Sequence, residues 1–411
     1  MSDKFMDINK LREDFPILKE KINNYNLVYF DNAATSQKPN QVLDAMLEFY
    51  TKYNSNIHRS ANAFGEKATI AFEQARVTIA KFINAEPEEI IFTSGTTESI
   101  NFVAFTWALD NLKPADEIVI SELEHHSNMV PWQQVAIKTG AKIKLIPVGL
   151  DWELDLSNLD DIITKNTKIV AITGASNVLG THVDLKPIVK RAKQVGAKVL
   201  VDAAQSVSHK KIDVKAIDCD FMAFSGHKML APTGVGILFI KKDLQDQVKP
   251  YQFGGGMVFE VDYDKASWLK NRQKYEAGTQ PIAQAIGFGA AIDYFNNKID
   301  MEQMAKHEAN LCKRAIDGLQ AIGGIKILGP IDRLKKTGHL VSFVVEGIHS
   351  HDVAAYLSDF GICIRAGHNC AQPLAKKIGI DAAVRVSFYF YNTEDEVDYF
   401  LSKMGEIRNN F

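Results

Sequence analysis

Cysteine, net charge and long apolar runs are all scarce in this chain, and each scarcity excludes a class of protein. The 411 residues include only four cysteines, no two of which form a C-x-x-C pair, so a zinc site or a thioredoxin-like site is poorly supported. The formal net charge is only −3, which gives no reason to expect nucleic acid or another polyanion as a partner. We therefore expect no bound metal and no nucleic-acid partner.

No stretch approaches the roughly 20 consecutive apolar residues that a membrane-spanning helix needs. The first residues contain acidic side chains where a signal peptide would need an unbroken apolar core. We therefore expect a cytoplasmic protein without a membrane partner. Neither an internal repeat nor a low-complexity tract is visible, and the length favours two domains, with a change of pattern near Lys298.

Apolar runs alternate with helical patterns between residues 89 and 240, which predicts an α/β fold with a mostly parallel sheet. The predicted strand at 198–202 ends in Asp202, and the strand at 221–224 leads into a polar turn that contains Lys228. Open α/β sheets bind ligands beyond the carboxyl ends of their strands. There, partly removed from water, Lys228 could form a Schiff base with a carbonyl. If each residue is considered alone, Lys228 could instead be a solvated loop lysine, and Asp202 could be a residue that caps a helix or turn.

The segment Ser94-Gly95-Thr96-Thr97-Glu98 follows another predicted strand and opens a helix. Free N–H groups and the helix dipole make such a helix start attractive to an anion. The segment lacks the lysine of a Walker loop and the glycines of a dinucleotide fingerprint. It predicts either a phosphate site or an ordinary helix start.

Two histidine-containing segments and one cysteine have interpretations that the sequence leaves open. His125 and His126 are adjacent and point apart, so His125 is better explained as a ring lying over an aromatic cofactor than as a metal ligand. His58 and Arg59 lie in a polar loop that is either surface coil or a contact for an anionic ligand. Cys370 is surrounded by polar residues, glycine and proline, and is the thiol that we expect to be exposed.

Two helices can be outlined from their patterns. A helix over residues 68–83 would place Ile70, Ala71 and Val77 at helical spacing along one face. The last helix is expected to begin at a capping box, in which Thr393 and Glu396 cap each other's backbone N–H groups.

Six motifs occur along the chain in this order: Ser94-Gly95-Thr96-Thr97-Glu98, Glu124-His125-His126-Ser127-Asn128, Ser176-Asn177-Val178-Leu179-Gly180, Val201-Asp202-Ala203-Ala204-Gln205, Ser225-Gly226-His227-Lys228 and Arg365-Ala366-Gly367-His368-Asn369-Cys370. With them the sequence resembles fold-type I pyridoxal phosphate enzymes of the class V aminotransferase group. It is most similar to the SUF-system (group II) cysteine desulfurases. The chain departs from that family at Asn369, where histidine is common, and at Gln280-Pro281, where the family tends to have Pro-Asn.

The resemblance implies a large domain over residues 18–297 that binds pyridoxal 5'-phosphate, and a smaller α+β domain over residues 1–17 and 298–411. Lys228 would link the cofactor, Asp202 would pair with its pyridine nitrogen, and His125 would stack on its ring. Gln205 would bond the phenolic oxygen. The phosphate would be held by Thr96, Thr97, Ser225, His227 and, from the other subunit of a homodimer, Thr279.

The resemblance also implies how the substrate is held and changed. Asn177, beside the cofactor, would grip the substrate carboxylate together with Arg365, and Arg385 would lie nearby. His58 and Arg59 are further candidates for substrate contact. L-cysteine would become L-alanine, and the Cys370 thiolate would keep the sulfur as a persulfide.

The sulfur would then pass to an acceptor protein, SufE-like or SufU-like, for iron–sulfur cluster assembly. A homodimer would have its active site at the subunit interface. The alternative functions are a selenocysteine lyase and another class V lyase or aminotransferase. Cys370 separates these readings, because transamination has no use for a thiol there.

Overall fold

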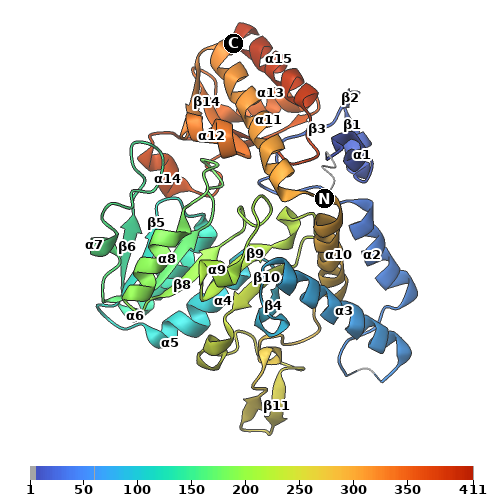
Figure 1. Cartoon of the computed structure of the whole chain (residues 1–411), viewed down its shortest axis with the longest axis vertical. Helices are drawn as coiled ribbons and strands as arrows, with labels where there is room; N and C mark the ends of the chain where they lie inside the picture. The colour runs from blue at the N-terminus through green and yellow to red at the C-terminus, as the bar shows by residue number, and fades with distance from the viewer. Residues whose placement is uncertain (1–5, 60, 411) are drawn as a thin grey trace.

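The computed structural model describes residues 6–59 and 61–410, and a seven-stranded sheet forms the centre of its larger part (Figure 1). Across this sheet the strands are ordered β4 (Ile90–Thr93), β10 (Gly236–Ile240), β9 (Phe221–Ser225), β8 (Lys198–Asp202), β7 (Thr167–Thr173), β5 (Glu117–Ser121) and β6 (Lys142–Ile146). Strand β10 runs antiparallel to both of its neighbours, and the other pairings are parallel. The predicted α/β fold with a mostly parallel sheet is confirmed.

Both faces of this sheet are buried, which explains the continuous apolar runs of its strands. Along β8, Val199 and Val201 join one core cluster and Leu200 joins another, because successive side chains of a strand point to opposite faces. The first cluster includes side chains of α2 (Asn40–Lys52), α3 (Ala63–Phe82), α8 (Leu185–Gln194), α9 (Val214–Ile217) and α10 (Ile282–Lys298). The second includes α4 (Thr96–Val103), the π-helical turn Ala104–Ala108 and α6 (Val130–Thr139).

A second, antiparallel sheet lies in the upper part of Figure 1. Its strands are ordered β13 (Ile325–Leu328), β14 (Leu340–Val345), β17 (Ala383–Ser387) and β16 (Arg365–Gly367). The helices of this part are α11 (Met301–Ile322), α12 (Ile331–Thr337), α13 (Ser350–Asp359) and α15 (Glu394–Asn410). Thr393 and Glu396 form the predicted capping box at the start of α15.

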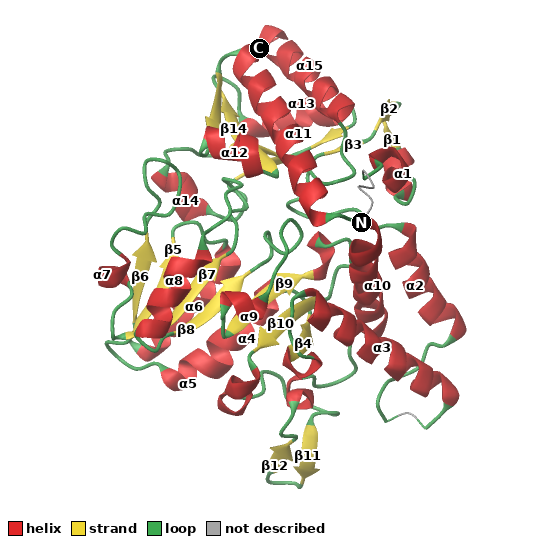
Figure 2. Cartoon of the chain, viewed as in Figure 1, coloured by secondary structure: helices red, strands yellow, loops and turns green. Residues whose placement is uncertain are grey.

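Shorter elements connect the parts built on the two sheets or lie at their surface (Figure 2). They are α1 (Ile8–Arg12), β1 (Lys21–Ile22), β2 (Tyr25–Asn26), β3 (Val28–Tyr29), α5 (Leu109–Asn111), α7 (Leu159–Ile162), β11 (Val258–Val261), β12 (Ala266–Trp268), β15 (Ile362–Cys363) and α14 (Gln372–Lys377). The sequence did not predict the projecting hairpin β11–β12, or β13, α12 and α14. All of these elements are short, and the hairpin is mostly exposed. None of them therefore has a long periodic pattern of apolar residues that the sequence could reveal.

The N-terminal segment packs against both parts of the molecule. Phe15 lies in the first core cluster of the large sheet. Phe30 lies in the cluster of the second sheet, and β3 pairs with β15. The division into residues 18–297 and residues 1–17 with 298–411 stays a prediction.

One predicted helix face was wrong. Ile70 in α3 is 64% exposed, whereas Phe72 and Ile79 are fully buried. The pattern failed because a buried charged residue, Arg76, occupies the core face that apolar residues were expected to mark.

Among the described residues, every helix is too short or too polar to cross a bilayer.

Candidate active site

A cavity of about 240 Å³ opens at the carboxyl ends of β7, β8 and β9, where the sheet was expected to bind its ligand. Twelve of the fifteen predicted site residues line it: Thr96, Thr97, His125, Asn177, Asp202, Gln205, Ser225, His227, Lys228, Arg365, Cys370 and Arg385. The other three, His58, Arg59 and Thr279, line a separate cavity of about 540 Å³. Within one chain, the structure does not bring these three to Lys228.

The amine of Lys228 follows β9 in a short 3-10 turn, Gly226–Lys228, and faces the cavity. No other described side chain forms a hydrogen bond or ion pair with its Nζ. Burial lowers the pKa of this amine to about 8, with Asp202 opposing the shift and Arg385 supporting it. A pKa of about 8 leaves roughly a tenth of the amine neutral at pH 7, far more than in an ordinary lysine. The neutral form is the one that can act as a nucleophile or accept a proton.

The carboxyl group of Asp202 ends β8 and is 4% exposed. Among the described residues its one hydrogen bond comes from the Ala204 N–H, at 2.9 Å. Burial raises the pKa of Asp202, because no cation in direct contact offsets the loss of water. A buried carboxylate that lacks a cation fits a protonated ring nitrogen of a ligand.

Hydroxyl groups gather where α4 begins. Thr96 Oγ1 lies 2.7 Å from Ser225 Oγ, and the Thr96 N–H donates to the same Ser225 oxygen at 2.8 Å. Thr97 Oγ1 lies 2.8 Å from Ser127 Oγ. Gly236 permits this arrangement, because a Cβ atom there would lie 2.4 Å from the Gly95 Cα. Hydroxyls at a helix start form a site for a phosphate group.

Two imidazoles beside this site are neutral. Burial, followed by the charge of Lys228, lowers the pKa of both His125 and His227 to about 4. His125 Nδ1 accepts a hydrogen bond from the Ser127 N–H at 3.1 Å, which fixes the ring beside the cavity.

The side chain of Gln205 is also held at the cavity, because it donates to the Ala33 carbonyl at 2.8 Å. Across the described part of the chain, no cluster of side chains could hold a metal ion.

Two arginines converge on Asp31, which the sequence analysis did not include in the site. Arg365 donates to both Asp31 oxygens, with Nη2 at 2.7 Å from Oδ2, and Arg385 Nη2 lies 3.2 Å from Oδ1. The Nε of Arg385 is buried without an acceptor among the described residues. Burial lowers the pKa of Arg385 to about 10, so the group stays cationic at neutral pH. A buried donor without an acceptor fits an added carboxylate.

The thiol of Cys370 is exposed and lines the same cavity as Lys228. Its loop is held by the Cys370 carbonyl, which accepts from the His126 N–H at 2.9 Å, and by the Asn369 carbonyl, which accepts from Asn177 at 2.6 Å. Both Asn369 and Cys370 have left-handed backbone, with φ values of 51° and 54°. Such strain is typical of functional loops. The exposure predicted for Cys370 is confirmed.

The comparison with known families decides what kind of protein carries this site. The sequence pattern described as Aminotransferase class-V matches residues 28–400. The chain belongs to the class-V aminotransferase family. Its α/β architecture is that of this family's solved members, as the following structures show.

Relatives within this family cover the whole chain. A cysteine desulfurase of Haloferax volcanii is 43% identical over 99% of this chain and 98% of its own length. A probable cysteine desulfurase of Halalkalibacterium halodurans is 45% identical over 99% of both chains. The apo structure of a cysteine desulfurase from Thermococcus onnurineus NA1 superposes with a TM-score of 0.94 at 40% identity and covers both chains completely. The cysteine desulfurase CsdA of Escherichia coli superposes with a TM-score of 0.91 at 36% identity, over 98% of this chain and 99% of that one.

Proposed function

We propose that this chain is a pyridoxal phosphate-dependent cysteine desulfurase, which converts L-cysteine to L-alanine and leaves a persulfide on Cys370. The observation that carries the proposal is that an exposed thiol and a buried amine, Cys370 and Lys228, line one cavity. The full-length similarity to cysteine desulfurases supports the same reaction. The motifs resemble those of the group II enzymes of the SUF system, which is the subtype that we propose.

The residues of the cavity fit pyridoxal 5'-phosphate. Lys228 would link its aldehyde carbon, and Asp202 would hold its ring nitrogen protonated. The hydroxyl groups of Thr96 and Ser225 would hold its phosphate at the start of α4. When bound, this cofactor supplies an electron sink for the bonds at the substrate Cα.

Lys228 and the arginines then divide the work on the substrate. The Lys228 Nζ, once free, takes the proton from Cα, because burial lowers its pKa to about 8 and so raises the share of neutral amine. Arg385 and Arg365 hold the substrate carboxylate, and Asp31 keeps both guanidinium groups in place before the substrate arrives. Asn177 lies beside them, since its carbonyl accepts from Arg385 at 2.9 Å.

Sulfur transfer is completed by Cys370. Its thiolate attacks the substrate sulfur, so an S–S bond forms as the Cβ–S bond breaks. The electron pair of the broken bond stays on carbon and takes up a proton, which gives alanine. The Cys370 sulfur and the substrate sulfur each lose one electron, the substrate carbon gains both, and no outside oxidant is needed. Because Cys370 is exposed, an acceptor protein, SufE-like or SufU-like, can then reach the persulfide.

We also propose that two chains form a homodimer with each active site at the interface. Leu43, Leu47 and Tyr50, spaced four and three residues apart on α2, are 42%, 61% and 54% exposed. This apolar stripe is available for a partner subunit. Thr279 and His58 lie outside the cavity of their own chain, as expected if they contribute to the partner's site.

The experiment compares Cys370→Ala with the native protein, with Cys363→Ala as the matched control. In Cys370→Ala we expect cofactor absorbance to remain while alanine release from L-cysteine falls by about 10² to 10⁴-fold. Labelling of the persulfide should disappear in this variant and remain in the control. Unchanged alanine release from Cys370→Ala would contradict the persulfide step and favour a selenocysteine lyase or another class-V reaction. Alanine release measured with and without a candidate acceptor protein tests the transfer.

A further inference from the structure

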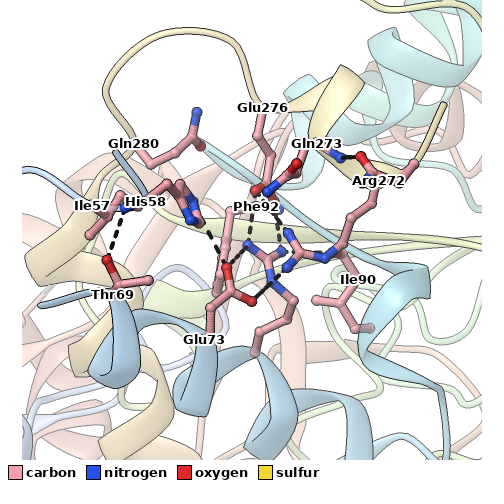
Figure 3. A network of polar contacts seen from close by, with 12 residues as sticks. Ile57, His58, Thr69, Glu73, Ile90, Phe92, Arg272, Gln273, Glu276 and Gln280 are labelled. Atoms are coloured by element: carbon pink, nitrogen blue, oxygen red, sulfur yellow. Dashed lines mark hydrogen bonds and ion pairs between the residues drawn. The ribbon is translucent and has the colours of Figure 1, made fainter. Parts of the chain in front are cut away.

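A network of four charged residues, two of them buried, lies at the second cavity (Figure 3). We call Glu73, Arg76, Arg272 and Glu276 the arginine network. Arg76 comes from α3 and is fully buried. Its Nη1 and Nη2 donate to the two oxygens of Glu276 at 2.7 and 2.8 Å, and its Nε donates to Glu73 at 3.0 Å. Such a bidentate pair fixes both orientation and distance.

The arginine network also binds the strand that leads to the phosphate site. Arg76 Nη1 donates to the Ile90 carbonyl at 2.8 Å, and Glu276 accepts from the Phe92 N–H at 3.1 Å. Both backbone groups belong to β4, which runs into the turn before Thr96. The guanidinium of Arg76 lies over the Phe92 ring, 4.5 Å from its centroid. Arg76 and Glu276 are therefore both bound to the same strand.

Glu276 is the last buried residue before an exposed turn. Gly278 and Thr279 are exposed, and a Cβ atom at Gly278 would contact nothing within 4 Å. The turn has one backbone hydrogen bond to the glycine loop opposite, from the Gly278 N–H to the Gly255 carbonyl at 2.8 Å. The Gln280 side chain adds hydrogen bonds to carbonyls within the turn. With so little packing of its own, the turn takes its position from the buried residues on either side, Glu276 before it and the start of α10 after it.

A second segment of the same cavity rests on the network. His58 Nε2 lies 3.9 Å from Glu73 Oε1, and the His58 N–H donates to Thr69 Oγ1 of α3 at 2.9 Å. His58 and Thr279 line one cavity, and both are connected to α3. His58 is connected through Glu73, and the turn that contains Thr279 is connected through Glu276 and Arg76.

We propose that Arg76 and Glu276 are positioning residues that act across the subunit interface. The pair sets the turn after Glu276 so that Thr279 reaches the phosphate of the cofactor bound in the partner subunit. This inference rests on the proposed function, because it needs the shared site of a homodimer. It assigns the buried pair a role in the site of the other chain.

The first measurement is the affinity of cofactor-free protein for pyridoxal phosphate, followed by the absorbance of the lysine-linked cofactor. Glu276→Gln keeps the shape of the side chain and removes the charge that holds Arg76. We expect the dissociation constant to rise about tenfold, the effect of losing one hydrogen bond to the phosphate. An unchanged dissociation constant would overturn the proposal.

Mixed dimers then locate the effect. Lys228→Ala leaves one lysine-bearing site per mixed dimer. When Glu276→Gln is on the chain that keeps Lys228, that site receives Thr279 from a chain with native Glu276, and we expect native affinity. When Lys228→Ala and Glu276→Gln are on the same chain and the partner is native, we expect the tenfold weaker affinity. A merely structural role would weaken the first dimer, and that result would overturn the proposal.

Other outcomes separate this inference from the proposed function. If Glu276→Gln does not fold, Glu276→Asp keeps the charge, shortens the side chain and replaces it in both dimers. A protein that shows the expected affinity pattern but releases no alanine from cysteine contradicts the proposed reaction and leaves the positioning role supported. A native protein that forms no dimer overturns the positioning role.

Discussion

Two clusters of polar side chains in the interior differ in whether burial leaves their side chains charged or neutral. In the arginine network each buried side-chain nitrogen of Arg76 has an acceptor. Burial opposes the charge of Arg76, but Glu276 and Glu73 outweigh it and raise its pKa. Here the charges survive burial because they are paired.

The second group is the histidine cluster, which consists of His182, His209, Glu308, His339 and Tyr389. His209 Nδ1 lies 2.9 Å from Glu308 Oε2, and the His209 and His339 rings stack with centroids 4.0 Å apart. Both ring nitrogens of His339 nevertheless lack a partner among the described residues. Burial lowers the pKa of His182 to about 3 and that of His339 well below its usual range.

The difference teaches that burial can either fix a charge or suppress it. The arginine network keeps its charges and can hold a segment in one place. In the histidine cluster, burial keeps His182 and His339 neutral. These two residues resist acid poorly, because a proton taken up by either ring would be a buried charge without water. The first is suited to positioning, and the second makes stability depend on pH.

The largest effect is expected from breaking the arginine network. Arg76→Met removes the bidentate partner of Glu276 and leaves the longer contact with Arg272 Nη1, at 3.4 Å, as its one cationic contact among the described residues. The free energy of unfolding should fall by about 3–5 kcal/mol. Urea denaturation measures the loss. The double variant Arg76→Met with Glu276→Leu removes both charges and should recover most of it. A loss below about 1 kcal/mol in the single variant would show that Glu276 is not dependent on Arg76.

The histidine cluster should reveal itself through pH. A histidine that is neutral when folded binds its proton only when unfolded, so its contribution to stability is complete above about pH 6.5 and is lost as the pH falls. For His182 this loss extends to about pH 3. Each such histidine makes stability fall by about 1.4 kcal/mol per pH unit in this range.

His339→Phe tests this slope, because it keeps an aromatic ring against His209 and removes one titrating group. Unfolding measured between pH 6 and pH 5 should then depend on pH less steeply, by about 1.4 kcal/mol per unit. The charges that act on His339 from other elements, Arg385 and Lys228 among them, are unchanged. The exposed His351 supplies a control in His351→Gln, and an equal change of slope there would contradict the assignment.

The smallest effect gives the scale for ordinary polar contacts. Thr393 caps α15 through its Oγ1, which accepts from the Glu396 N–H at 3.2 Å. Thr393→Ala should lower the free energy of unfolding by about 1 kcal/mol, without changing its pH dependence between pH 6 and pH 5. A loss as large as that of Arg76→Met would remove the contrast between a local cap and a buried network.

Strand ends explain why much of the site could be predicted from the sequence. Asp202 and Lys228 each follow a buried strand, and parallel strands bring their carboxyl ends to one edge. The ion pair of Asp31 with Arg365, 334 residues away, has no local pattern, so the sequence analysis did not include Asp31 in the site. The wrong face of α3 has a similar cause, because Arg76 is buried by partners distant in sequence. The roles of the individual site residues stay predictions.

The left-handed backbone at Asn369 and Cys370 has a consequence for how firmly this loop is held in place. Asparagine tolerates this conformation, whereas for cysteine it costs about 1–2 kcal/mol. The hydrogen bonds from His126 and Asn177 to this loop offset that cost, and the strain is relieved if they break. The strained backbone therefore lowers the energy that the loop needs to give up these two hydrogen bonds.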